Sequence, residues 1–185
     1  MTSGRAIRGY IFDAYGTLFD VHSVVEAGRA ITGDPITLSM TWRQKAARVH
    51  VAARADGTLR GLLGGHRGGT APHSAPAGSG GLSNGSPRML EAVVASAGLG
   101  GLMIRVLSVD AVKTYKPAPV VYALGPQALG LPAADILFVS SNAWDVAGAK
   151  AFGYQVAWCN RVGAAEEELG VSPDYVVPSL DQLPT

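Results

Sequence analysis

The chain contains 185 residues, enough for one domain of ordinary size with a small insertion and too few for two large domains. Hydrophobic residues make up 48%, charged residues 16%, and the formal net charge is +1. This balance excludes a disordered polyelectrolyte and gives no basic surface for nucleic acid or anionic membranes. A single cysteine, Cys159, excludes an internal disulfide framework, and no window approaches the roughly 20 apolar residues of a membrane span. We therefore expect a cytoplasmic protein.

Short apolar runs alternate with helical patterns along most of the chain. In chain order, the sequence predicts a strand at 9–12, helices at 21–31, 36–45 and 88–97, a strand at 105–109, a helix at 117–129, a strand at 136–139, a helix at 144–152, and strands at 155–159 and 175–177. Gly98, Gly130 and Gly153 follow three of these helices as stop signals. Strands separated by helices favour an α/β fold, a Rossmann-like parallel sheet flanked by helices.

The stretch from Ala46 to Leu82 differs in composition from the rest of the chain. It contains no aromatic residue and no Ile, Lys, Glu, Asn, Gln or Met, and it holds nine of the 24 glycines. Interior glycines disfavour a helix, and Val49, Val51, Thr58 and Thr70 are the only β-branched residues in the stretch that could pack a strand. We therefore predict irregular structure here, with no strand leading to Ser83, because GSGG stands where an apolar run would be needed.

Polar clusters follow three of the apolar runs or turns, at residues 13–17, 83–86 and 140–145, and a fourth with two lysines occupies 113–117. In an open parallel sheet the carboxyl ends of the strands meet in one crevice. We expect a carboxylate, a lysine and several hydroxyl and amide groups to gather there, as a nucleophile with supporting groups. Any one of these clusters alone would be an ordinary turn or cap. The prediction of a site therefore depends on all four clusters occurring together, in this order.

Four strings carry a family resemblance: FDAYGTLFDVHSV, LSNGSP, YKP and FVSSNAWDVAGAKAFGY. They resemble the signature blocks of the haloacid dehalogenase superfamily and, more narrowly, its L-2-haloacid dehalogenase branch. The likeness covers residues 7–45 and 82–185 in the family's order. It implies an α/β core with a helical cap, a small 2-haloacid and water as reactants, and neither cofactor nor metal. The dimer common in this family is an expectation that the sequence leaves open.

The resemblance also implies roles for individual residues. Asp13 matches the nucleophile that attacks C2 of an (S)-2-haloacid and forms an ester, which water hydrolyses to an (R)-2-hydroxyacid. Lys116 would keep Asp13 ionised, and Arg43 would receive the departing halide. The other matched catalytic positions are Thr17, Ser140, Asn142 and Asp145, and the matched substrate-binding or pocket positions are Tyr15, Gln44, Ser83, Asn84, Tyr122 and Trp144. For Tyr122 and Trp144, packing in the core is an equal alternative.

Tyr15 separates two activities within the superfamily. Phosphatases of the superfamily carry a second aspartate two positions after the nucleophile, which protonates the leaving oxygen. This chain has Tyr15 at that position. Because a halide leaves without a proton, this residue favours a dehalogenase over a phosphatase.

The resemblance implies a core made of residues 1–21 and 82–185, with 22–81 as an abbreviated and irregular remnant of the cap. Ser83 follows Asp13 by only 70 positions (83 − 13). One hypothesis is that residues 46–81 are cap sequence read out of frame, followed by a deletion or a second frame change that restores the frame near Leu82. The alternative to an active enzyme is therefore a non-catalytic remnant of the family.

Overall fold

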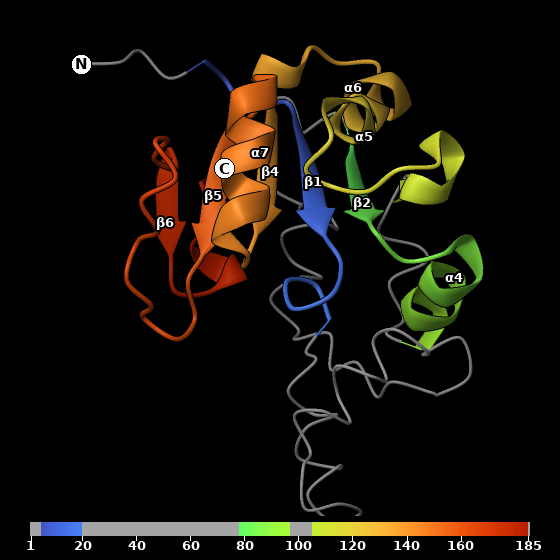
Figure 1. Cartoon of the computed structure of the whole chain (residues 1–185), viewed down its shortest axis with the longest axis horizontal. Helices are drawn as coiled ribbons and strands as arrows, with labels where there is room; N and C mark the ends of the chain where they lie inside the picture. Colours follow the sequence, from blue (N-terminus) through green and yellow to red (C-terminus); the bar gives the residue numbers. More distant parts are fainter. Residues whose placement is uncertain (1–4, 20–77, 97–104, 185) are drawn as a thin grey trace, which may run out of the picture.

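The computed structural model describes residues 5–19, 78–96 and 105–184. In this part of the chain a six-stranded sheet has the order β3-β2-β1-β4-β5-β6, and every neighbouring pair is parallel (Figure 1). The strands are β1 (Gly9–Asp13), β2 (Ser79–Ser83), β3 (Arg105–Ser108), β4 (Ile136–Ser140), β5 (Gln155–Cys159) and β6 (Tyr175–Val177). The predicted α/β class with a parallel sheet is confirmed.

Among the described residues, four α-helices lie between these strands: α4 (Pro87–Ser96), α5 (Pro119–Tyr122), α6 (Leu124–Leu129) and α7 (Ala143–Phe152). The helix predicted at 117–129 is divided, because α5 ends at Tyr122. Pro126, four residues later, has no N–H to donate to the Tyr122 carbonyl. That carbonyl instead accepts a hydrogen bond of 2.6 Å from the Tyr154 hydroxyl. The side chain of the residue directly before β5 thus supplies the bond that the helix lacks.

The hydrophobic core lies on both faces of the sheet. Tyr10, Phe12 and Val139 are buried on one face with α4, and Ile11 and Phe138 are buried on the other with α5 and α7. Strands covered on both faces read as continuous apolar runs, which is why β1, β4 and β5 were visible in the sequence. This core holds the carboxyl ends of β1 and β4 side by side.

The strand β2 corrects the prediction that no strand precedes Ser83. Residues 79–83 are all buried and pair with β1 on one side and β3 on the other. A ladder of backbone hydrogen bonds needs no side chain, so glycine is accepted where the packing leaves little room. A Cβ on Gly80 would lie 2.9 Å from the Arg105 carbonyl oxygen. Residues 79–81, which precede the core boundary expected at 82, are thus part of the sheet.

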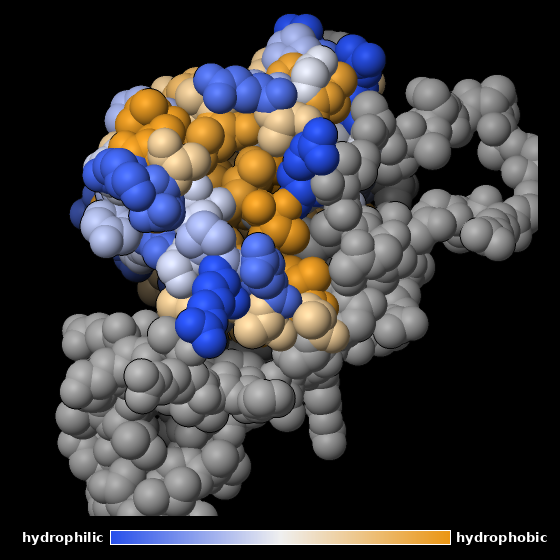
Figure 2. All heavy atoms as spheres, turned by 90° about the vertical axis from the view of Figure 1, so that its right-hand side faces the viewer, coloured by the Kyte–Doolittle hydropathy of each residue, from blue (hydrophilic) through white to orange (hydrophobic). Residues whose placement is uncertain are grey.

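The helices predicted at 21–31 and 36–45, and almost all of the stretch at 46–81, lie outside the described residues. Within the described ranges, none of the helices is both long enough and apolar enough to cross a membrane. Figure 2 looks onto the β3 side of the sheet, where hydrophobic residues are exposed among hydrophilic ones. Val106 on this edge strand is 39% exposed.

Candidate active site

Asp13 ends β1 and is buried at the carboxyl edge of the sheet. The chain then turns tightly, since the Leu18 and Phe19 amides donate to the Ala14 carbonyl at 3.0 and 2.9 Å. Gly16 has a φ of 89°, a conformation that favours glycine. The turn brings Thr17 back over the strand end, and its hydroxyl donates to Asp13 Oδ2 at 3.3 Å.

Lys116 provides the positive charge of the site. Its ammonium lies 2.9 Å from Asp13 Oδ1 and 2.9 Å from Asp145 Oδ2, with 1% of the side chain exposed. Burial alone would lower the pKa of Lys116, but the two carboxylates outweigh burial and raise it. The lysine is therefore held as a cation between two anions, and its backbone N–H donates to Asn84 Oδ1 at 3.0 Å.

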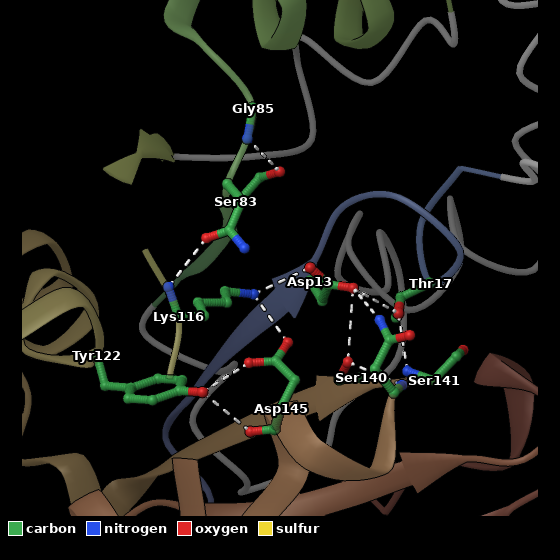
Figure 3. Close-up of polar contacts among 11 residues, drawn as sticks. Asp13, Thr17, Ser83, Gly85, Lys116, Tyr122, Ser140, Ser141 and Asp145 are labelled. Atoms are coloured by element: carbon green, nitrogen blue, oxygen red, sulfur yellow. Dashed lines mark hydrogen bonds and ion pairs between the residues drawn. The ribbon is translucent and has the colours of Figure 1, made fainter. Parts of the chain in front are cut away.

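Two further donors reach Asp13 from the end of β4 and the loop that follows it. The Asn142 amide donates to Asp13 Oδ2 at 3.1 Å, and the Ser140 hydroxyl donates to the same oxygen at 3.5 Å. Together with Thr17 they give Oδ2 three donors, whereas Oδ1 contacts Lys116 alone among the residues that the structure describes (Figure 3). Every polar contact of the carboxylate shown is with a donor, an arrangement complementary to an anion.

Asp145 lies behind Lys116 and is completely buried. Burial raises the pKa of its carboxyl, even though Lys116 opposes this shift. The Tyr122 hydroxyl donates to Asp145 Oδ1 at 2.8 Å, and burial raises the pKa of that phenol well above its ordinary value. Tyr122 is itself fully buried. The Tyr122 hydroxyl thus bonds Asp145, the second of the two carboxylates that hold Lys116.

Replacing Tyr122 with phenylalanine is expected to lower the free energy of unfolding by about 1–3 kcal/mol, because a buried carboxylate loses a donor. Urea denaturation measures the change. Tyr115→Phe is the matched control, because it removes the hydroxyl of a tyrosine that is 67% exposed. Equal stability of the two variants would contradict the assigned contact.

Gly148 in α7 leaves room for the Tyr122 ring. A Cβ at this position would lie 2.6 Å from the Tyr122 hydroxyl oxygen and 2.8 Å from Pro117 Cβ. We expect Gly148→Ala to be destabilising, since overpacking costs about 1–3 kcal/mol against about 1 kcal/mol of helix preference for alanine. In a Tyr122→Phe background the same change should cost less. A more stable Gly148→Ala protein in urea denaturation would show that this close fit has no consequence.

The remaining predicted residues lie around this cluster. The buried Ser83 hydroxyl accepts from the Gly85 N–H at 3.1 Å and so shapes the turn after β2. Asn84 reaches the backbone of Lys116, while half-buried Tyr15 packs against Phe19 with ring centroids 6.2 Å apart. The other three predicted residues are not joined to the cluster by a described contact: Trp144 is 42% exposed, and Arg43 and Gln44 lie outside the described residues.

Two residues of the site were absent from the sequence prediction. The Ser141 backbone N–H donates to the Thr17 hydroxyl oxygen at 2.8 Å, which links the loops after β1 and β4. The Phe138 ring lies beneath Lys116, with its centroid 5.0 Å from the ammonium. Phe138 belongs to an apolar strand, and Ser141, although it lies in the polar cluster at 140–145, bonds Thr17 through its backbone, so neither side chain marked its position as part of the site.

The assembled cluster offers nucleophilic chemistry. A carboxylate held by a neighbouring ammonium and fixed by three donors is oriented to attack an electrophilic carbon. Asp145 is not available to protonate a leaving group, because its oxygens are engaged by Lys116 and Tyr122. A substrate whose leaving group departs as a stable anion suits this site.

Comparisons with known proteins agree with this chemistry. A sequence model of the family described as "haloacid dehalogenase-like hydrolase" matches residues 81–153. Haloacetate dehalogenase H-2 of Moraxella sp. (strain B) is 36% identical, with 97% of each chain covered. (S)-2-haloacid dehalogenase of Pseudomonas sp. (strain YL) is 40% identical over 94% of this chain and 91% of its own.

Among solved structures, the L-2-haloacid dehalogenase from Xanthobacter autotrophicus with chloropropionic acid covalently bound is similar to this chain. It has a TM-score of 0.72 at 32% identity, covering 95% of this chain and 96% of its own. The alignment with the Moraxella relative extends over 227 positions. The chain has 185 residues, so at least 42 of those positions (227 − 185) have no counterpart in it. The relatives are thus matched from end to end by a shortened chain.

Proposed function

Because the chain belongs to the haloacid dehalogenase superfamily, within its L-2-haloacid dehalogenase branch, we propose that it hydrolyses short (S)-2-haloacids to (R)-2-hydroxyacids. The observation that carries the proposal is the buried Asp13 carboxylate, held 2.9 Å from Lys116 and bonded to Thr17, Ser140 and Asn142. The covalently bound chloropropionic acid in the Xanthobacter relative supports a covalent route.

In the first step Asp13 attacks C2 of the haloacid, the carbon–halogen bond breaks, and the halide leaves with its electron pair. Oδ1 is the favoured attacking oxygen, since Oδ2 already accepts three hydrogen bonds. Attack from the side opposite the halogen inverts C2. Lys116 stabilises the attacking anion beforehand and offers its charge to the substrate carboxylate once Asp13 is esterified.

In the second step water attacks Cγ of the Asp13 ester. The bond between that carbonyl carbon and the esterified oxygen breaks, so the hydroxyl oxygen of the product comes from Asp13. The overall reaction consumes one haloacid anion and one water, and it yields a 2-hydroxyacid anion, a halide ion and one proton. No redox or group-transfer partner is required for this balance.

A phosphatase of the same superfamily is the second candidate activity. Its leaving alkoxide needs a proton. Tyr15 stands at the position of the family's acid and packs against Phe19, and burial raises the pKa of this phenol, so it is a poor proton donor near neutral pH. This observation favours the dehalogenase.

A non-catalytic remnant is the third candidate, favoured by the 42 or more alignment positions without a counterpart. Against it, β2 is present and pairs with β1, and Asp13 contacts Thr17, Lys116, Ser140 and Asn142 within the described residues. These contacts support retained chemistry.

The experiment is halide release by the purified chain from the two enantiomers of 2-chloropropionate, with chiral chromatography of the lactate formed. We expect chloride from the (S) substrate and (R)-lactate as product. Phosphate release from 4-nitrophenyl phosphate with magnesium present tests the second candidate. Chloride release no greater than that of Asp13→Asn would overturn the proposal in favour of the remnant.

A further inference from the structure

Arg161 lies outside every motif considered so far, yet its guanidinium makes three hydrogen bonds at the site. Nη1 donates to the Gly16 carbonyl at 2.8 Å and to the Ser141 hydroxyl at 3.0 Å. Nη2 donates to the Thr17 carbonyl at 2.8 Å. One exposed side chain from the loop after β5 therefore fastens the loops that follow β1 and β4.

The loop that carries Arg161 is itself held in place by its neighbour Asn160. The Asn160 side chain donates to the Ala164 carbonyl at 2.8 Å and accepts from the Ala164 N–H at 2.9 Å. Its backbone N–H donates to the Val177 carbonyl at 2.8 Å, which ties the loop to β6. These hydrogen bonds fix the backbone of the loop that carries Arg161, and so they also limit where the guanidinium can lie.

The three described donors on Asp13 Oδ2 come from the two loops that Arg161 joins and from the strand end that leads into the second of them. Thr17 lies in the first loop and Asn142 in the second, and Ser140 is the last residue of β4. The two loops touch directly where the Ser141 N–H donates to the Thr17 hydroxyl at 2.8 Å. In addition, the indole N–H of Trp158 in β5 donates to the Ser141 carbonyl at 3.2 Å. Arg161 closes this arrangement from the solvent side.

We propose that Arg161 is a positioning residue that sets the orientation of the Asp13 carboxylate by fixing both donor loops. This inference rests on the proposed dehalogenase function. The guanidinium suits the task because its planar fork directs two nitrogens at two adjacent carbonyls and a hydroxyl at once. A lysine ammonium, with one nitrogen, cannot span the same acceptors.

The activity test compares Arg161→Ala, Arg161→Lys and Arg161→Gln with Arg88→Ala, which removes an exposed arginine from α4. We expect Arg161→Ala to lower the single-turnover rate of halide release by about 10- to 100-fold, the effect of a misplaced reacting group. KM should change far less, Arg161→Lys should recover little, and added guanidinium ion should restore part of the Arg161→Ala rate. A normal rate in folded Arg161→Ala or Arg161→Gln would overturn the proposal.

A second measurement keeps the inference separate from the proposed function. Residue-resolved amide hydrogen exchange reports the Ser141 N–H and the Leu18 N–H, both bonded within the fastened loops. We expect faster exchange at both amides in Arg161→Gln and no change in Arg88→Ala. If the wild-type chain released no halide, the proposed function would fail while exchange still tested the positioning role. Unchanged exchange in Arg161→Gln would overturn that role.

Discussion

Replacing Asp13 with asparagine is expected to reduce halide release from (S)-2-chloropropionate by about 10³-fold or more, because a neutral amide is not a nucleophile. The hydrogen-bond donors around it would remain in place. Chloride release under substrate saturation measures the loss.

Asp110→Asn is the matched control for Asp13. Asp110 is an exposed aspartate paired with an exposed lysine, Lys113, and it takes no part in the cluster. Its replacement should leave the rate unchanged. Equal activity of Asp13→Asn and Asp110→Asn would contradict the assignment of the nucleophile.

Replacing Lys116 with methionine is expected to abolish halide release and to lower the free energy of unfolding by about 3–5 kcal/mol, the cost of removing one partner of a buried ion pair. Both Asp13 and Asp145 would lose their cation. Urea denaturation at neutral pH measures the stability, and Lys113→Met, which removes an exposed ammonium, is the control. A Lys116→Met protein as stable as this control would contradict the buried network.

The pH dependence of the free energy of unfolding also tests the ion pairs of Lys116. The pKa of Lys116 is raised above 10.5 in the folded protein, so the ammonium contributes its full stabilisation below pH 10.5 and loses it as the pH rises through the folded value. In Lys116→Met the raised pKa of Asp145 has no opposing cation. That variant should therefore regain stability on acidification, as the buried carboxyl becomes protonated.

The apolar strands and the convergence of the polar clusters were predictable from the sequence. Residues such as Ile11 and Phe138 form continuous runs because their strands are covered on both faces. Since the carboxyl ends of parallel strands share one edge, Asp13 and Ser140 had to meet there. Periodicity and topology together were sufficient for these contacts.

The strand β2 and the buried supports of the site were not predictable in this way. Gly80 and Gly81 carry no side chain, and their place in the sheet depends on backbone pairing with distant segments. Tyr122 could equally have faced a pocket, and only tertiary packing directs its hydroxyl to Asp145. Arg161 follows a strand by two residues, and its bonds to Gly16 and Thr17 join positions far apart in sequence.

The origin of the stretch at 46–81 stays a hypothesis, although the alignment positions without a counterpart are in keeping with a deletion. We propose that the encoding DNA, read with a single-base shift, restores an aromatic-rich helix after Lys45. Sequencing of that DNA tests the idea, and the absence of such a frame would contradict it. The result bears on the cap and leaves the assignment of Asp13 to be tested separately.

The central claim, that Asp13 forms an ester with the substrate, is tested most directly by a single turnover in H₂¹⁸O with enzyme in excess over (S)-2-chloropropionate. Mass spectrometry then compares the lactate with the peptide that contains Asp13. If water attacks the ester carbonyl, ¹⁸O enters the Asp13 carboxylate and the first lactate carries the ordinary isotope. Labelled lactate together with an unlabelled Asp13 peptide would show direct attack by water and contradict the account.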